Sequence, residues 1–313
     1  MHDVVLAEVV RSGFVESRHY GSIVALDPDG SVVWGRGEPE APVFARSCNK
    51  PIQAASMVGS GLTVRGRLLA LVAASHSGEP MHLDGVREIL AGAGLPESAL
   101  QTPPQYPIEP RVRDAYIAAG GGASPVAMNC SGKHAGMLAT CVANGWPIDS
   151  YRDPGHPLQH RIAEDFAELT GLSIPVTGID GCGAPLFGTT LVGLARAFGR
   201  IRQAPAGTPE RVVAEAIGGF PEYVSGTDRD EAKLLNAYPQ AVAKAGAEAC
   251  YAVAMPDGSA VALKIGDGGA RARAVVMVAA LRRLGWDHPV LDEIGQVAVL
   301  GGGKPVGEVR AVL

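Results

Sequence analysis

The chain carries the stretch SIVALDPDGSVVW at residues 22–34, and this stretch decides how the N-terminal part folds. Two runs of apolar and small residues flank Asp27-Pro28-Asp29-Gly30, a combination typical of a turn between two strands. The pattern predicts a β-hairpin. An earlier strand is predicted at residues 8–10, and a third strand near residues 43–44.

Strand patterns return at the other end of the chain. Residues 249–255 and 259–265 flank Pro256-Asp257-Gly258 and predict a second hairpin, and residues 305–312 predict a last strand. Because strands gather at both ends, we predict an α/β fold with one antiparallel sheet formed from both chain ends, flanked by helices, and an α-rich middle. Residues 1–313 are expected to form a single domain.

The middle of the chain has apolar residues at helical spacing. Residues 95–125 are rich in Pro and Gly, which predicts a long surface excursion with only one helix, near residues 112–119. The other predicted helices cover residues 49–58, 67–74, 86–91, 132–143, 158–169, 188–198, 210–217 and 271–284.

The composition favours a globular protein that binds a small polar ligand. Of the 313 residues, 47% are hydrophobic and 19% are charged, which excludes a disordered chain. The net charge is −5 and no cluster of Lys or Arg is present, so we do not expect a nucleic-acid partner. Aromatic residues make up only 5%, which disfavours a ligand held by ring stacking.

Neither a secretion signal nor a membrane span is expected. The first eight residues, MHDVVLAE, lack a basic and an apolar region. The most apolar later stretch, residues 274–281, is much shorter than the roughly 20 residues that cross a bilayer. We therefore expect a cytoplasmic protein. Its five cysteines, an odd number, are expected to be reduced thiols.

Ser47 and Lys50 form the first candidate catalytic pair, at a predicted strand-to-helix corner. Three residues of helix rise bring a Lys amine within reach of a Ser hydroxyl, which needs a proton acceptor to become a nucleophile. The amine must be neutral to act, which requires burial or a neighbouring cation. The alternative is a Ser near a helix start and a solvated Lys.

Two later segments could complete such a site. Ser75 lies at a predicted helix end, where it could relay protons or only satisfy free carbonyls. Lys264 precedes a glycine turn on a late strand, where it could be catalytic or an ordinary edge-strand lysine. The order Ser-x-x-Lys, Ser, Lys-x-Gly matches the layout of penicillin-recognising serine hydrolases.

Cys130 and Cys182 each lie among small residues, and we expect both at loop-to-helix junctions. Two thiolates could bind zinc, although the usual Cys-x-x-Cys spacing and His partners are absent. Small-residue packing and a disulfide-prone pair remain alternatives. His134 would ordinarily be a helix histidine, and Cys141 and Cys250 are expected to be packing residues.

Six segments together resemble the L-asparaginase II family. They run in the family's order over residues 11–268, and the NCSGKH segment is long enough to be specific. The segments are RSGFVES at 11–17, RSCNKP at 46–51, ASHSGE at 74–79, NCSGKH at 129–134, DGC at 180–182 and KIGDG at 264–268.

The resemblance implies a fold similar to serine β-lactamases and glutaminases, and hydrolysis of L-asparagine to L-aspartate and ammonia. It also implies a nucleophile pair, a supporting pair, a zinc ion beside the site, and side chains near the substrate. The implied residues are Ser47 with Lys50, Ser75 with Lys264, the zinc positions Cys130, Lys133 and Cys182, and the substrate positions Arg46, His134 and Asp180.

Several alternatives stay open at this point. A glutaminase could use the same arrangement of serine and lysine residues. A β-lactamase or D-peptidase could use it too, although these two enzymes would be exported. A non-catalytic zinc- or amino-acid-binding protein would keep the cysteines but would not need two Ser-Lys pairs. One methylene in a pocket is worth only about 1–3 kcal/mol, so asparagine and glutamine cannot be separated here. A symmetric homodimer is the default expectation.

Overall fold

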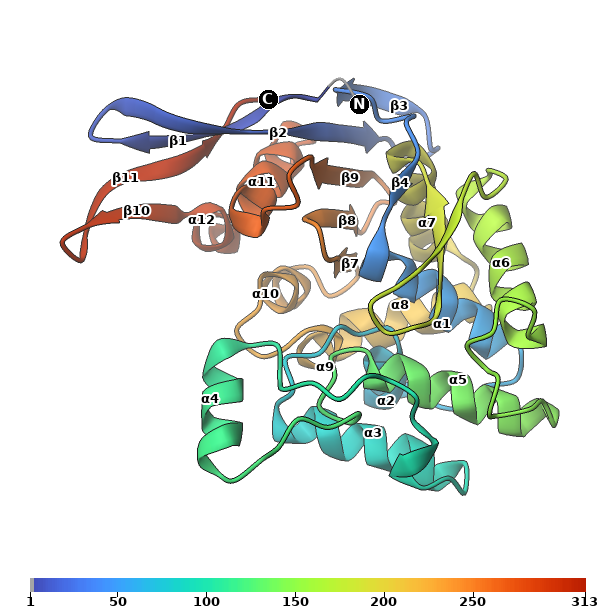
Figure 1. Cartoon of the computed structure of the whole chain (residues 1–313). Helices are drawn as coiled ribbons and strands as arrows, with labels where there is room; N and C mark the ends of the chain where they lie inside the picture. The colour runs from blue at the N-terminus through green and yellow to red at the C-terminus, as the bar shows by residue number, and fades with distance from the viewer. Residues whose placement is uncertain (1–2) are drawn as a thin grey trace.

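An eight-stranded antiparallel sheet forms the upper layer of the molecule (Figure 1). The computed structural model describes residues 3–313; Met1 and His2, part of the segment in which no secretion signal was expected, lie outside the described residues. In spatial order the strands are β10 (Val297–Gly301), β11 (Lys304–Ala311), β1 (Val4–Arg11), β2 (Phe14–Leu26), β9 (Ala260–Ile265), β8 (Cys250–Ala254) and β7 (Val242–Ala245), and β3 (Val32–Arg36) pairs with β2. The predicted sheet from both chain ends is confirmed.

The first and last parts of the chain meet in the middle of this sheet. Val9 of β1 lies opposite Val309 of β11, and Ser22 of β2 lies opposite Lys264 of β9. β8 is buried along its whole length and β9 along all but one residue, because α7 (Leu191–Gln203) and α11 (Arg273–Arg283) pack against them. The far halves of β1, β2, β10 and β11 extend beyond the helices as an arm (Figure 1).

A second, three-stranded sheet of β4 (Val43–Phe44), β6 (Pro185–Thr189) and β5 (Thr177–Ile179) connects the main sheet to the helices. The predicted helix at residues 188–198 therefore began too early. The side chain of Thr190 accepts a hydrogen bond from Gly193 N at 3.0 Å and caps α7, which begins at Leu191. Cys182 accordingly lies in the turn between two strands and not at a loop-to-helix junction.

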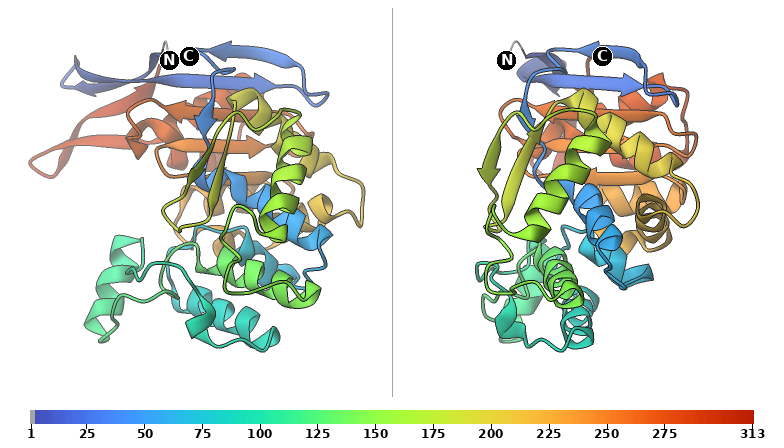
Figure 2. Two further views of the ribbon diagram at one scale, coloured as in Figure 1. Left: turned by 45° about the vertical axis from the view of Figure 1, so that its right-hand side comes forward. Right: turned by 90° about the vertical axis from the view of Figure 1, so that its right-hand side faces the viewer.

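Helices fill the lower part of the molecule (Figures 1 and 2). Every helix that was predicted from the spacing of apolar residues is present, although its first and last residues differ from the predicted ones. The sequence patterns did not predict the helices α9, α10 and α12. Their bounds are α1 (Lys50–Gly59), α2 (Gly66–Val72), α3 (Pro80–Gly92), α5 (Ser131–Asn144), α6 (Pro157–Thr170), α8 (Pro209–Gly219), α9 (Pro221–Val224), α10 (Asp230–Ala237) and α12 (Pro289–Gly295).

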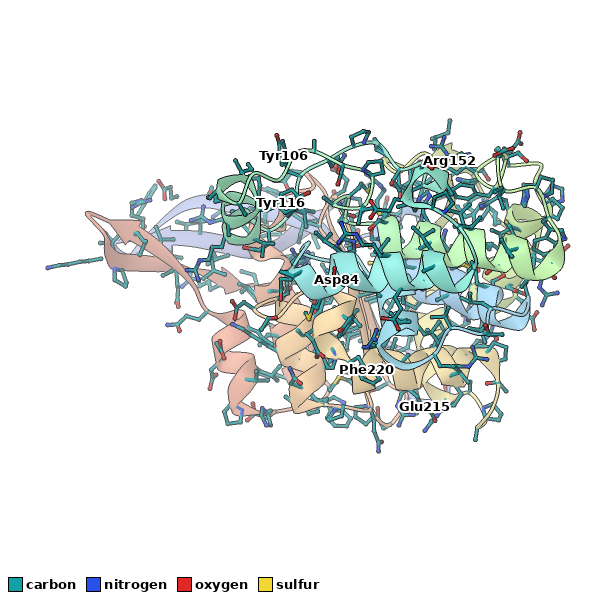
Figure 3. All side chains as sticks on the ribbon, turned by 90° about the horizontal axis from the view of Figure 1, so that it is seen from below. Asp84, Tyr106, Tyr116, Arg152, Glu215 and Phe220 are labelled. Carbon is teal, nitrogen blue, oxygen red and sulfur yellow. The ribbon has the colours of Figure 1, made fainter. Side chains whose placement is uncertain are left out.

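The excursion at residues 95–125 is confirmed, and its one α-helix is α4 (Pro110–Ala118), which contributes no buried residue. Figure 3 shows the excursion from below, with Tyr116 of α4 near Asp84 of α3. Within residues 3–313, no helix is long and apolar enough to cross a membrane.

Candidate active site

Ser47 lies in a strained corner between β4 and α1. A short 3-10 helix, Arg46–Asn49, makes this corner, and Arg46 has a φ of 52°. Non-glycine residues in this left-handed region cost about 1–3 kcal/mol and persist where their surroundings hold them, often at functional sites. Here Asn49 Nδ2 donates a hydrogen bond of 2.9 Å to Phe187 O of β6. The corner is therefore fixed to the small sheet.

Lys50, the first residue of α1, points into the protein. Its side chain is 1% exposed, and its Nζ donates to Ser75 Oγ at 2.8 Å and to the carbonyl of Ala74. Within residues 3–313, no carboxylate lies within 4.0 Å of Lys50 Nζ. Lys50 is thus a buried amine whose side-chain partner is the second candidate serine.

The Ser75 loop is held on two sides by backbone hydrogen bonds. Ser75 N donates to Val224 O at 3.2 Å, and His76 N donates to Asn129 O at 3.1 Å. The His76 ring also bonds Ser131 Oγ through Nε2 at 2.8 Å. Burial, together with the charges of His82 and Lys50, holds the pKa of His76 well below its usual range, so this ring is neutral.

Lys264 does not meet Ser75 in the structure. Its Nζ donates to Glu248 O at 2.8 Å and to Ile265 O at 3.4 Å, and its side chain lines a cavity beside Arg46. The expected pairs were Ser47 with Lys50 and Ser75 with Lys264. Within residues 3–313 the structure instead joins Lys50 to Ser75, with no hydrogen bond from Lys50 to Ser47 or from Lys264 to Ser75.

A different lysine, Lys244 of β7, is the second buried amine near Lys50. It is fully buried, donates to Ala245 O at 2.6 Å, and lies 3.5 Å from Glu231 Oε1. Burial lowers the pKa of Lys244 to about 8; the Glu231 carboxylate opposes this, and the positive charge of Lys50 adds to it. Cys48, next to Ser47, donates through its thiol to Lys244 O at 3.0 Å.

Sequence reasoning missed Lys244, although a signal was available. Lys244 is the one charged residue in the short apolar run Val242-Ala243-Lys244-Ala245, and all four residues of this run are buried although β7 is the last strand of the main sheet. Such a lysine must be buried with a partner, and the acidic pair Asp230-Glu231 precedes it in the sequence.

Arg46 and Asp180, both expected near the substrate, contact each other. Arg46 Nε donates to Asp180 Oδ1 at 2.7 Å, and the same oxygen accepts from Gly181 N at 2.8 Å. The two side chains are only 25% and 10% exposed, so they form a partly buried pair of opposite charges at the corner.

His134, the third expected substrate position, is buried in α5. Its Nδ1 lies 2.7 Å from Tyr151 OH, and Tyr151 OH in turn accepts from Gln101 N at 3.2 Å. Burial lowers the pKa of His134 to about 4, against an opposing interaction with Cys182, so the ring is neutral. Its Nε2 has no hydrogen-bond partner of ordinary geometry among the described residues.

Cys130, Lys133 and Cys182 converge in one buried cluster. Lys133 Nζ donates to Cys182 Sγ at 3.2 Å, and Cys182 Sγ lies 3.8 Å from Asp180 Oδ2. A hydrogen bond from Cys130 lowers the pKa of Cys182, and the charge of Lys133 lowers it further. The same hydrogen bond, together with burial, raises the pKa of Cys130. Cys182 is therefore the thiolate of the pair.

The packing of α5 explains how this cluster reaches the site. Cys130 stands at the N-cap of α5, as predicted, and Gly132 follows in its first turn. A Cβ on Gly132 would lie 2.4 Å from Leu71 O of α2, so only glycine lets α5 approach α2 this closely. The NCSGKH segment thereby places its cysteine and lysine near the Ser75 loop.

The cluster's donor set fits a thiophilic ion such as Zn²⁺. Two sulfurs and an amine nitrogen converge, and cysteine and nitrogen ligands are those that zinc prefers. Among residues 3–313, no set of three or more His, Cys, Asp or Glu side chains is arranged to hold a metal, so Lys133 would have to complete the set.

Comparisons with known proteins identify the chain's family. Solved structures with a similar arrangement include a β-lactamase from Mycobacterium bovis (13% identity, 84% of this chain and 94% of that one, TM-score 0.48). Two others are Mglu in its native form (12%, 90% and 68%, TM-score 0.43) and EstCE1, a hydrolase with promiscuous acyltransferase activity (11%, 88% and 93%, TM-score 0.43). No curated protein matches the chain. The model of the L-asparaginase II family matches residues 7–311, so the chain belongs to this family and is an asparaginase-like amidohydrolase.

Proposed function

We propose that the protein hydrolyses L-asparagine to L-aspartate and ammonia through an acyl-enzyme formed on Ser47. The observation that carries this proposal is the hydrogen bond from the buried Lys50 amine to Ser75 Oγ. Lys50 lies about one helical turn after Ser47, which stands in the strained corner next to Arg46. Family membership supports the amide substrate, and the site supplies the groups that acyl transfer needs.

In the first step, Ser47 Oγ attacks the carbon of the side-chain amide and its proton passes to the neutral Lys50 amine. The C–N bond then breaks, and the nitrogen leaves as ammonia after it receives the proton through Ser75, the hydroxyl that Lys50 contacts. Water next attacks the ester, aspartate leaves, and the Ser47 hydroxyl is restored.

Lys244 is a second buried amine. Burial lowers the pKa of Lys244 to about 8, and the positive charge of Lys50 adds to this lowering. Glu231 limits the effect, because its carboxylate favours the charged form of Lys244. In this scheme Lys244 and Glu231 are positioning residues that act through Lys50.

The Arg46–Asp180 pair suits the zwitterionic end of the substrate. Arg46 Nε lies 2.7 Å from Asp180 Oδ1. The Arg46 guanidinium could bind the α-carboxylate of the substrate, and the Asp180 carboxylate could bind its α-ammonium. Because Arg46 precedes Ser47 directly, an amino acid held by this pair would present its side-chain amide to the nucleophile.

We also propose that Cys130, Lys133 and Cys182 bind Zn²⁺ beside the site. When bound, such an ion supplies Lewis-acid polarisation or anchors a substrate group. Lys133 would have to lose its proton to act as a ligand, so metal affinity should fall as the pH is lowered.

A coupled ammonia assay tests the proposed reaction. The purified protein is offered L-asparagine, L-glutamine and nitrocefin. We expect ammonia from asparagine and no opening of the lactam. Hydrolysis of nitrocefin without ammonia release from asparagine would instead support a β-lactamase-type activity.

A further inference from the structure

The hydroxyl of Tyr151 is buried next to His134, the residue that follows Lys133 in α5. No part of the Tyr151 side chain is exposed, and its backbone carbonyl accepts a hydrogen bond of 2.7 Å from Gln159 Nε2 of α6. Its ring packs edge-on against the His134 ring, with centroids 5.5 Å apart and an interplanar angle of 79°. Phenylalanine would fill the same space, so the hydroxyl must be explained by its hydrogen bonds.

Two groups contact this hydroxyl, and only one of them can receive its proton. Gln101 N lies 3.2 Å away, and a backbone N–H can only donate. His134 Nδ1 lies 2.7 Å away, and no other polar group of residues 3–313 bonds the hydroxyl. Burial raises the pKa of Tyr151 to about 12, so the hydroxyl keeps its proton. It must donate to His134 Nδ1, because an unmade buried hydrogen bond costs about 1–3 kcal/mol.

This donation decides which ring nitrogen of His134 carries a proton. A nitrogen that accepts a hydrogen bond carries none, so Nδ1 is unprotonated. Burial lowers the pKa of His134 to about 4, so the ring is neutral and holds one proton, on Nε2. The backbone amide of Gln101, the one donor here that cannot be reversed, therefore sets the direction of the whole hydrogen-bond series.

The series ends at Cys182. Because Nδ1 is taken by Tyr151, the interaction between His134 and Cys182 goes through Nε2, which has no other partner among residues 3–313. The hydrogen bond from Cys130 lowers the pKa of Cys182 most, and Lys133 and His134 add to this lowering. A thiolate only accepts hydrogen bonds, so a proton on Nε2 suits it, whereas the other form of the ring would turn a lone pair toward it.

We propose that Tyr151 is a positioning residue that fixes His134 with its proton on Nε2, so that the ring donates to Cys182 Sγ and orients this sulfur. The consequence for metal binding rests on the zinc site proposed above, because a ligand sulfur held in one place binds a metal better than a free one. Partners that stand behind metal ligands in this way typically contribute about 10- to 100-fold to metal affinity. Tyr151 acts only through His134 and takes no part in bond breaking.

Nitrogen NMR of the intact, metal-free protein with isotope-labelled histidine tests the form of the ring. Long-range correlation spectra separate nitrogens that carry a proton from those that do not, and the signals missing in His134→Gln are those of His134. We expect a proton on Nε2 and none on Nδ1 at neutral pH. In Tyr151→Phe the Nδ1 signal should move toward that of a nitrogen without a hydrogen bond. A proton on Nδ1 in the unmodified protein would overturn the proposal, whether or not the variant folds.

Zinc affinity, measured by competition with a coloured chelator, tests the effect on Cys182. We expect Tyr151→Phe to weaken zinc binding about tenfold, with an unchanged number of bound ions. The matched control Tyr251→Phe removes another buried hydroxyl, one without a hydrogen-bond partner among residues 3–313, and should change neither the affinity nor the His134 signals. Equal affinity in Tyr151→Phe and the unmodified protein would reject the role of Tyr151 in the metal site. If the unmodified protein binds no zinc, the proposed metal site fails, and the nitrogen signals alone confirm or reject the hydrogen-bond series.

Discussion

Lys50 Nζ donates a 2.8 Å hydrogen bond to Ser75 Oγ, and both residues are at least nine-tenths buried. This contact joins the start of α1 to the loop after α2, two segments that are 25 residues apart. Lys50 follows Ser47 by three residues in the chain and contacts Ser75 through its amine. The proposed reaction requires the same amine to take the proton of Ser47.

Replacing Lys50 by Met keeps the length of the side chain and removes the proton acceptor. We expect kcat for asparagine to fall by a factor of about 10²–10⁴, the usual contribution of a general base. The control Lys304→Met, at an exposed lysine of β11, should keep full activity, and circular dichroism should show an unchanged fold. Unchanged kcat in Lys50→Met would contradict the assignment of Lys50 as the proton acceptor.

The pH profile reports on the buried amines. Burial lowers the pKa of Lys244 to about 8, so we expect kcat/KM to rise as the pH increases through about 8, where Lys244 loses its proton. Glu231 raises the pKa of Lys244, so Glu231→Gln should lower it and move the midpoint of this rise to lower pH. An unchanged midpoint, or one displaced to higher pH, in a variant that still folds would reject this role of Glu231.

Asp180 is expected to act in binding more than in bond breaking. Because its carboxylate bonds the Arg46 guanidinium at 2.7 Å, Asp180→Asn removes one charge of the pair that complements a zwitterion. Loss of such a contact costs about 1–3 kcal/mol, so KM for asparagine should rise about 10- to 100-fold with a smaller change in kcat. The exposed control Asp149→Asn should have no effect. A fall in kcat at constant KM would argue against the binding role.

Cys182 is the thiolate of the buried cluster, so Cys182→Ser should lower the zinc content of the purified protein. Elemental analysis checks this against Cys141→Ser, which removes a buried thiol on the same helix as Lys133 but outside the cluster. Equal metal in the two variants, or none in the unmodified protein after growth with zinc, would eliminate the proposed ligands.

The main sheet could be predicted from the sequence because its hairpins carry their own turn chemistry. The turn at Asp27–Gly30 and the turn at Pro256–Gly258 each lie between apolar runs, and both hairpins are present. The start of α7 was predicted too early because Pro185–Thr189 is apolar and follows a helical spacing as well as a strand spacing. Pairing with β4 and β5 decides in favour of the strand, and that pairing is not local.

The pairing of side chains within the site was less predictable. Lys264 was expected beside Ser75 because the order of the motifs matches that of penicillin-recognising serine hydrolases and because the family resemblance implies this pair. On β9, Lys264 lies opposite Ser22 of β2 and Cys250 of β8. Its amine donates a hydrogen bond to the backbone carbonyl of Glu248 and not to Ser75. Lys244 lies on β7, a strand that was not predicted, so its burial beside Glu231 was missed. Register and strand order decide such contacts, and motif order alone does not contain them.

Formation of the acyl-enzyme on Ser47 is the central claim, and mass spectrometry of the protein during turnover tests it most directly. The protein is mixed with L-asparagine, quenched in acid within milliseconds and digested. We expect the mass of an aspartyl ester on the peptide that contains Ser47, no such adduct in Ser47→Ala, and loss of ammonia release in that variant. An adduct on the Ser75 peptide, or unchanged ammonia release by Ser47→Ala, would contradict the account.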